Sequence, residues 1–153
     1  MPEQSTINSL VSNLATVMEQ VIAVVNNTPM ETFERKADVK KWSKKEILGH
    51  LIDSGINNLQ RFMECQVKPL PYVIRRYEQD SLVLTNNYQH SDVGEILNCW
   101  KAINTRIKVV IQSMSPAVLA NEIILPDGTK ATLGFLIQDY VDHMEHHLKQ
   151  LKS

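Results

Sequence analysis

The chain has 153 residues, a length that suits one folded domain with a single core. Its 43% hydrophobic and 22% charged residues are close to the average for globular proteins, which excludes a disordered chain. Sixteen basic and 17 acidic residues give a net charge of -1, which excludes the electrostatic footprint of a nucleic-acid-binding protein. We therefore expect one domain over residues 1–153 and no nucleic-acid partner.

The N-terminal stretch "MPEQSTINSL" has no basic segment followed by an apolar core, so it predicts no secretion signal. Apolar runs fall short of the roughly 18 residues that a membrane span needs. We therefore expect a cytoplasmic protein without a membrane partner. In that compartment the two cysteines, Cys65 and Cys99, are expected to be reduced packing residues and not a disulfide.

Apolar residues recur at spacings of three and four residues in four stretches, the pattern of amphipathic helices. These helices are predicted over about residues 5–25, 43–66, 91–114 and 132 to near the C-terminus. The second opens on "SKKE", a capping box. Four helices of roughly 20 residues predict an all-α protein, a four-helix bundle.

Two connections between these helices are unusual. Residues 67–90 form a link far longer than a typical helix–helix connection, and such links are often functional or contain a short helix. Residues 116–131 hold the β-like run "NEIILPDGTKAT", which contains the turn signal Pro126-Asp127-Gly128. We interpret this run as a short extended excursion and not as a sheet.

The stretch "DHMEHHLKQ", residues 142–150, contains three of the five histidines. On a helix, His143 and His147 lie one turn apart on one flank of the apolar face, and His146 points towards the polar side. Two histidines spaced this way are a usual pair of metal ligands. The alternative is a pair of half-buried histidines that are satisfied by hydrogen bonds, and the spacing alone does not decide between the two.

A third ligand is harder to place by counting. His90 precedes the third helix and is expected at the surface. His50 falls on the polar flank of the second helix, among Glu46, Asp53 and Asn57, nearly opposite the apolar face. It can serve a metal only if that flank lines a cleft towards the fourth helix, and periodicity leaves this open.

Two stretches, "KWSKKEILGHLIDSGINNLQRF" (41–62) and "TLGFLIQDYVDHMEHHLKQL" (132–151), resemble the two signature helices of the DinB-like superfamily. "YEQD" (77–80) resembles a further segment of that family. The resemblance implies a four-helix bundle that often forms a homodimer. It also implies a divalent metal, zinc or nickel, held by His50, His143 and His147.

Three histidine ligands leave a coordination position open, as catalytic sites do. The resemblance implies either a thiol S-transferase or a metal-dependent hydrolase, acting on a small-molecule substrate. A thiol has to come as a low-molecular-weight cosubstrate, because neither cysteine lies in the motifs. We take the transferase as the leading hypothesis and the hydrolase as the alternative. A third hypothesis is a non-catalytic metal-binding or stress-response module.

The sequence also offers a few candidate site residues besides the histidines. Asp53, three residues after His50, is the first candidate for an acceptor behind a ligand or for a group that polarises a bound water. Arg75 and Arg76 in the long link are candidates for binding the carboxylates of the cosubstrate. Arg61 and the run of lysines over 40–45 have the same charge, although a solvated helix entrance is the alternative for the run.

Overall fold

The computed structural model describes residues 2–153 and shows a four-helix bundle. The bundle helices are α1 (Pro2–Asn27), α3 (Lys44–Val67), α5 (Val93–Gln112) and α6 (Leu133–Lys152). Helix α1 packs against α5 and α6, and α3 packs against the same two helices from the other side. The all-α bundle that the sequence predicts is confirmed, with helix bounds within a few residues of the expected ones.

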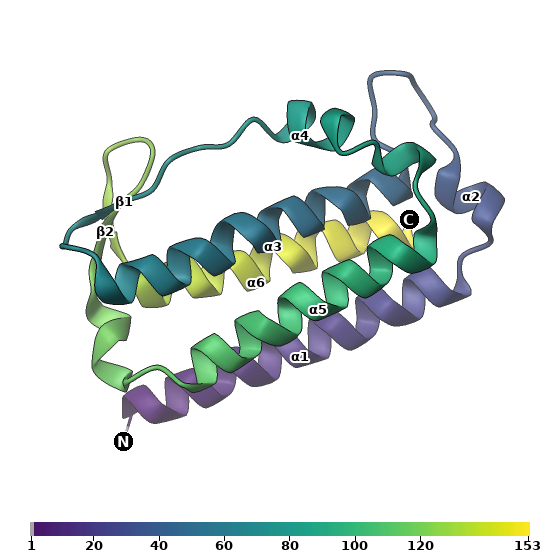
Figure 1. The fold of residues 1–153 in the computed structure, drawn as a ribbon. Helices are drawn as coiled ribbons and strands as arrows, with labels where there is room; N and C mark the ends of the chain where they lie inside the picture. Colours follow the sequence, from purple (N-terminus) through teal and green to yellow (C-terminus); the bar gives the residue numbers. More distant parts are fainter. Residues whose placement is uncertain (1) are drawn as a thin grey trace.

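The helix directions explain the long link. In Figure 1, α3 and α5 run in the same direction, and α1 and α6 run in the opposite one. The chain therefore returns along the whole bundle between α3 and α5. This link contains strand β1 (Tyr72–Val73), helix α4 (Gln79–Thr85) and the 3-10 helix η1 (Tyr88–His90). The expectation of a short helix in this link is confirmed.

The helices are held by one continuous apolar core. Its largest fully buried side chains come from all four bundle helices and from the segments that join them: Trp100, Phe33, Phe62, Ile7, Leu14, Leu48, Leu51, Ile96, Ile107, Ile111, Ile123 and Leu133. Helix α1 is long and apolar enough over Gln4–Asn27 to cross a membrane by length and composition. Seven of its apolar side chains are buried in the core, where α1 packs against α5 and α6: Ile7, Leu10, Leu14, Val17, Met18, Val21 and Val25.

One short helix was not predicted, and one local expectation is wrong. The residues after Pro29 form a further short helix, α2 (Met30–Glu34), because Phe33 finds a buried place in the core. The extended run is part of a small sheet, in which β2 (Glu122–Ile124) pairs with β3 (Lys130–Thr132) antiparallel and with β1 parallel. The pairing of β1 with β2 joins segments about 50 residues apart, so local patterns could not reveal it.

The first half of α3 is covered on its outer side. Helices α2, α4 and η1 all contact α3, and residues 45–55 are buried without interruption. Hydrogen bonds hold this cover in place, since Ser43 Oγ donates to Gln89 Oε1 (2.5 Å) and Gln89 Nε2 donates to the carbonyl of Glu34 (2.7 Å). The polar flank of the predicted helix therefore faces the protein interior and not solvent.

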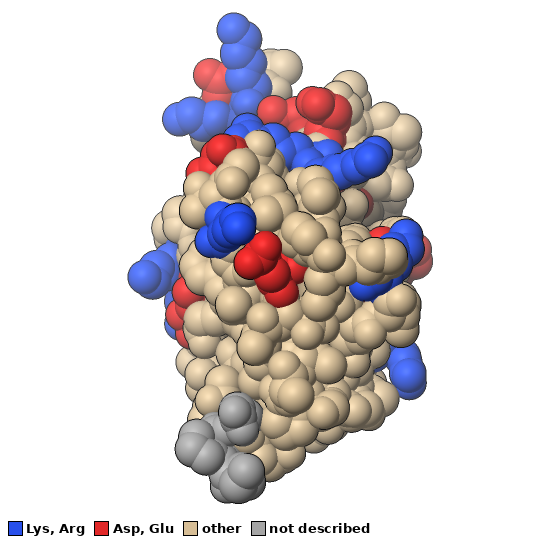
Figure 2. Space-filling model, turned by 90° about the vertical axis from the view of Figure 1, so that its left-hand side faces the viewer, with Lys and Arg blue, Asp and Glu red and all other residues tan. Residues whose placement is uncertain are grey.

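Charge is unevenly distributed at the end of the molecule that carries the sheet. Figure 2 shows this end, with lysine, arginine and acidic side chains gathered in its upper half, on the side of the long link. Among the residues that are coloured in the lower half of the same face, few are charged. The charged half is the one that contains the cavity described below.

Candidate metal centre

Three histidines from two helices meet inside the bundle. His50 lies in the covered half of α3, and His143 and His147 lie one turn apart on α6. The Nε2 atom of His143 is 3.1 Å from the Nε2 atoms of both His50 and His147. One ring nitrogen from each of the three lies within 4.8 Å of the others. The structure thus brings together the three histidines that the resemblance selects.

Burial keeps all three rings neutral at pH 7. His50 is 1% exposed, and burial, then the neighbouring His143 and His147, lower its pKa to about 3. Burial, then His147 and His146, lower the pKa of His143 to about 4. Burial also lowers the pKa of His147, although its bond to Gln150 opposes this. Neutral imidazole is the form that binds a metal ion.

The outward ring nitrogens are held unequally. His147 Nδ1 lies 2.7 Å from Gln150 Oε1, so we assign the proton to Nδ1 and a lone pair to the Nε2 atom that faces the other rings. His50 packs against Trp42, with ring centroids 4.7 Å apart, but its buried Nδ1 has no hydrogen-bond partner among the described residues. The convergent Nε2 atoms fit a metal ion.

Asp53 is buried, with 3% of its surface exposed, and its hydrogen bonds are not to the three histidines. Its Oδ1 accepts hydrogen bonds from Tyr88 Oη (2.6 Å) and Asn86 Nδ2 (3.0 Å), while its Oδ2 has no partner among the described residues. Burial raises the pKa of Asp53, and the two hydrogen bonds oppose this. The carboxylate therefore joins α3 to its cover, and its predicted role at the metal stays a prediction.

The remaining basic candidates are not part of the three-histidine cluster, although the ring of His146 lies 5.1 Å from that of His147. His146 and His90 are exposed, as expected. The lysine run is not simply solvated. Lys45 is 3% exposed and pairs with Glu34 at 3.0 Å, and Lys44 Nζ donates to the carbonyls of Leu151 and Ser153 at the end of α6.

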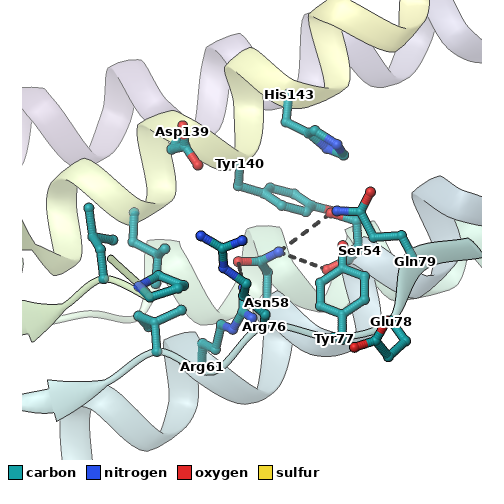
Figure 3. A pocket seen from close by; sticks show the side chains of 14 residues that line it. Ser54, Asn58, Arg61, Arg76, Tyr77, Glu78, Gln79, Asp139, Tyr140 and His143 are labelled. Atoms are coloured by element: carbon teal, nitrogen blue, oxygen red, sulfur yellow. Dashed lines mark hydrogen bonds between the residues drawn. The ribbon is translucent and has the colours of Figure 1, made fainter. Parts of the chain in front are cut away.

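A cavity of about 610 Å³ opens beside the cluster, and His143 is part of its wall. Its side chains come from α3, α6, the link into the start of α4 and the turn after β2, and Figure 3 shows the labelled polar ones. The polar lining consists of Ser54, Asn58, Arg61, Arg76, Tyr77, Glu78, Gln79, Asp139, Tyr140 and His143. Burial, then repulsion from Asp142, raises the pKa of Asp139. The cavity is large enough for a small-molecule ligand.

The two predicted arginines differ in whether they reach this cavity. Both line a neighbouring hollow beside Tyr72 and Lys68, but only Arg76 also lines the cavity that contains His143. The arginine that joins Arg76 in the cavity wall is Arg61 of α3.

Neither cysteine takes part in the cavity. Cys65 and Cys99 are both free, and burial raises the pKa of each thiol. Cys65 is a packing residue, as expected, but Cys99 is exposed. Neither lines the cavity. Any thiol that reacts there has to be supplied as a separate molecule.

Comparison with known proteins agrees with this geometry. The family model of the DinB superfamily matches residues 11–151. The chain belongs to the DinB superfamily. A protein of Oceanobacillus iheyensis, described as a putative metal-dependent hydrolase, is 22% identical over 94% of this chain and 80% of its own length.

Two solved structures share the fold. YfiT from Bacillus subtilis, described as a probable metal-dependent hydrolase with an unusual four-helix bundle topology, superposes with a TM-score of 0.84 at 18% identity, over 95% of this chain and 83% of its own. The mycothiol-dependent maleylpyruvate isomerase has a TM-score of 0.76 at 9% identity, over 95% of this chain and 60% of its own. At these identities the likeness extends to the fold.

Several side chains around the DinB-type cluster were missed by the sequence analysis. Gln150 follows His147 by three residues, a helical spacing that could have suggested the contact. Tyr77 is the first residue of the "YEQD" segment and lines the cavity. Trp42 directly precedes the N-cap of α3, a position that could have suggested its contact with that helix. Tyr88 left no local signal, because it reaches α3 only through the fold of the long link.

Proposed function

We propose that this chain is a metal-dependent enzyme in which His50, His143 and His147 hold one divalent transition-metal ion, and that it transfers a low-molecular-weight thiol to small electrophiles. The observation that carries the proposal is the position of His143. It belongs both to the three-histidine cluster and to the wall of the 610 Å³ cavity. A ligand in the cavity therefore reaches the centre directly.

The histidines fit the metal because they converge as neutral bases from two rigid helices. Gln150 fixes the orientation of His147, and Trp42 packs on the ring of His50. A metal held there would lower the pKa of a thiol or a water molecule so that it attacks at neutral pH. Zinc and nickel both accept such a donor set.

The chain's own residues would bind the substrate and take up the proton. No cysteine of the described chain lines the cavity, so the nucleophile enters with a cosubstrate or as water. The carboxylates of Glu78 and Asp139 line the cavity and are the candidate acceptors for the released proton. Tyr77 and the neighbouring residues before α4 form part of the cavity wall.

Hydrolysis is the second candidate function, with water in place of the thiol. It is favoured by the descriptions of the Oceanobacillus protein and of YfiT. The transferase is favoured by the thiol dependence of the isomerase that shares the fold and by a cavity larger than water alone requires. A homodimer remains an expectation from the family resemblance.

One experiment separates the two. The zinc- or nickel-loaded protein is incubated with 1-chloro-2,4-dinitrobenzene and with bacillithiol, mycothiol, glutathione or cysteine in turn, and separately with p-nitrophenyl acetate without thiol. A transferase accelerates the substitution of the aryl chloride by the thiol, which forms a thioether and releases chloride and a proton, and this acceleration needs His143. Accelerated ester cleavage without thiol supports the hydrolase instead. No acceleration of either reaction above that of the His143→Ala variant contradicts the enzymatic proposal.

A further inference from the structure

Arg61 is a partly buried cation in the wall of the cavity. Its guanidinium donates to Asn58 Oδ1 (3.4 Å) and to the carbonyl of Arg75 (2.5 Å), and it lies over the ring of Tyr77 at 5.6 Å from the centroid. None of the ion pairs formed by the described residues includes Arg61. The side chain is therefore held in place by neutral groups only.

Such an arrangement orients the charge without neutralising it. Guanidinium carries five N–H donors, and the contacts of Arg61 to Asn58 and Arg75 use two of them. Burial lowers the pKa of Arg61, which reflects the cost of removing the cation from water without a counter-ion. A buried charge of this kind is stabilised when an anion binds beside it.

Arg76 supplies a second cation to the same wall and is likewise absent from the ion pairs of the described chain. In Figure 3, Arg61 and Arg76 lie on the side of the cavity away from α6, with His143 and Asp139 on the α6 side. The cavity thus has a cationic wall opposite the helix that carries two of the three clustered histidines.

We propose that Arg61 and Arg76 form the anion-binding wall of the cavity, and that the molecule bound there carries a carboxylate remote from its reacting atom. The forked guanidinium of arginine matches a carboxylate with two parallel hydrogen bonds. This inference rests on the proposed function, because it names the class of substrate or thiol cosubstrate that the same site accepts.

A carboxylate fits better than a phosphate. Glu78 and Asp139 also line the cavity, and Asp127 of the β2–β3 turn lies close enough to interact electrostatically with Arg76. These three carboxylates repel a doubly charged phosphate more strongly than a singly charged carboxylate. The acidic groups therefore restrict the charge that the two arginines can accept.

The test is direct binding, measured by NMR titration of the full-length protein as purified. The probes are glutarate, its neutral analogue glutaramide, and inorganic phosphate. The variants are Arg61→Gln, Arg61→Lys and Arg76→Gln, with Arg75→Gln as the matched control, because Arg75 borders the neighbouring hollow together with these two arginines but does not line the cavity. Circular dichroism checks the fold of each variant.

We expect glutarate to bind the wild type and Arg75→Gln equally, and to bind Arg61→Gln at least about tenfold more weakly, since a charge-assisted pair contributes about that factor. Arg61→Lys recovers part of the affinity, and glutaramide binds all forms weakly. If Arg61→Gln fails to fold, Arg76→Gln carries the same expectation.

Absent glutarate binding, equal affinities for wild type and Arg61→Gln, or phosphate binding tighter than glutarate would each overturn the inference. The proposed function fails separately, when the purified protein neither contains nor accepts a metal. Glutarate binding does not require the metal, so the two failures are distinguishable.

Discussion

The two halves of α3 have the same helical geometry but different surroundings. Residues 45–55 are buried on every side, whereas residues 56–67 return to ordinary amphipathic alternation, with Ile56, Met63 and Val67 in solvent. The difference comes from the second layer, since α2, α4 and η1 contact α3. A polar residue beneath that layer, such as His50, is an interior residue despite its position opposite the apolar face.

The comparison has a functional meaning. Burial under the cover lowers the pKa of His50 to about 3, so the ring is neutral and available to a metal. Beyond the cover, Asn58 and Arg61 face the cavity, where a substrate can reach them. One helix thus supplies the buried candidate ligand His50 from its covered half, and the cavity residues Asn58 and Arg61 from its other half.

The largest expected effect comes from lifting the cover. A Cβ on Gly49 would lie 2.1 Å from Cδ2 of Tyr88, so Gly49→Ala displaces the tyrosine ring and breaks its bond to Asp53. We expect a loss of about 3 kcal/mol in the free energy of unfolding from overpacking and the lost hydrogen bond, measured by urea denaturation.

Gly94→Ala is the matched control, because its Cβ would meet only the flexible Asp92 side chain at 3.1 Å. We expect this change to alter the unfolding free energy by less than about 0.5 kcal/mol. Equal effects of the two substitutions would show that η1 does not press on α3 as described.

The next effect concerns the buried carboxylate beneath the cover. Asp53→Ala leaves the hydroxyl of Tyr88 without its acceptor, and we expect a loss of about 2 kcal/mol in unfolding free energy. Asp53→Asn keeps an acceptor oxygen and removes a carboxylate whose pKa burial has raised, so it should cost less than about 1 kcal/mol.

The variants Asp53→Ala and Asp53→Asn also distinguish a structural role of this carboxylate from a catalytic one. An Asp53→Asn variant that is stable and fully active excludes the role of Asp53 at the metal. A variant that is stable but inactive supports that role. If Asp53→Asn destabilises the protein as much as Asp53→Ala, the carboxylate has a charge-dependent partner that the hydrogen bonds to Asn86 and Tyr88 do not explain.

A smaller effect is expected at the start of α3. Ser43 caps the helix by accepting from the backbone N–H of Glu46 (3.1 Å), and it also donates to Gln89 in the cover. Ser43→Ala should lower the melting temperature, by an amount equivalent to about 1–2 kcal/mol. Thr132→Ala removes only the exposed cap of α6, so it should lower the melting temperature less than Ser43→Ala does. A larger loss for Thr132→Ala than for Ser43→Ala would contradict the role of Ser43 in holding the cover.

The smallest effect lies at the uncovered end of α3. Burial, then the hydrogen bond to Glu64, raises the pKa of Tyr72 to about 12. Because folding favours the neutral phenol, its contribution to stability is complete below the unfolded pKa near 10 and is lost as the pH rises towards 12. In thermal melts between pH 8 and 11, the melting temperature of Tyr72→Phe should therefore fall less steeply with rising pH than that of the wild type. An unchanged decline would contradict the Tyr72–Glu64 contact.

Periodicity was sufficient for the parts of the fold that are fixed by local patterns. The four long helices, the capping box at Ser43 and the shared face of His143 and His147 all follow from spacings of three and four residues. The place of His50 did not, because its burial depends on the link over residues 68–92, which folds back over α3. Only the family resemblance selected it before the structure.

The residues that line the cavity likewise could not be grouped from local sequence patterns. Arg61 and Arg76 share the cavity wall although 15 positions separate them in the sequence, while the adjacent Arg75 meets them only in the neighbouring hollow. Which of several arginines meet in space depends on the path of the link and on the small sheet. Both of these form through long-range contacts that composition and periodicity do not encode.

The most direct test of the central claim is the metal content of untagged protein after incubation with zinc or nickel, measured by elemental analysis. Wild type is compared with His143→Ala/His147→Ala and with His146→Ala, the exposed neighbour outside the cluster. We predict about one ion per chain in the wild type and in His146→Ala, none in the double variant, and unchanged helicity in all three. Metal-free wild type, or equal metal in the double variant, would contradict the account.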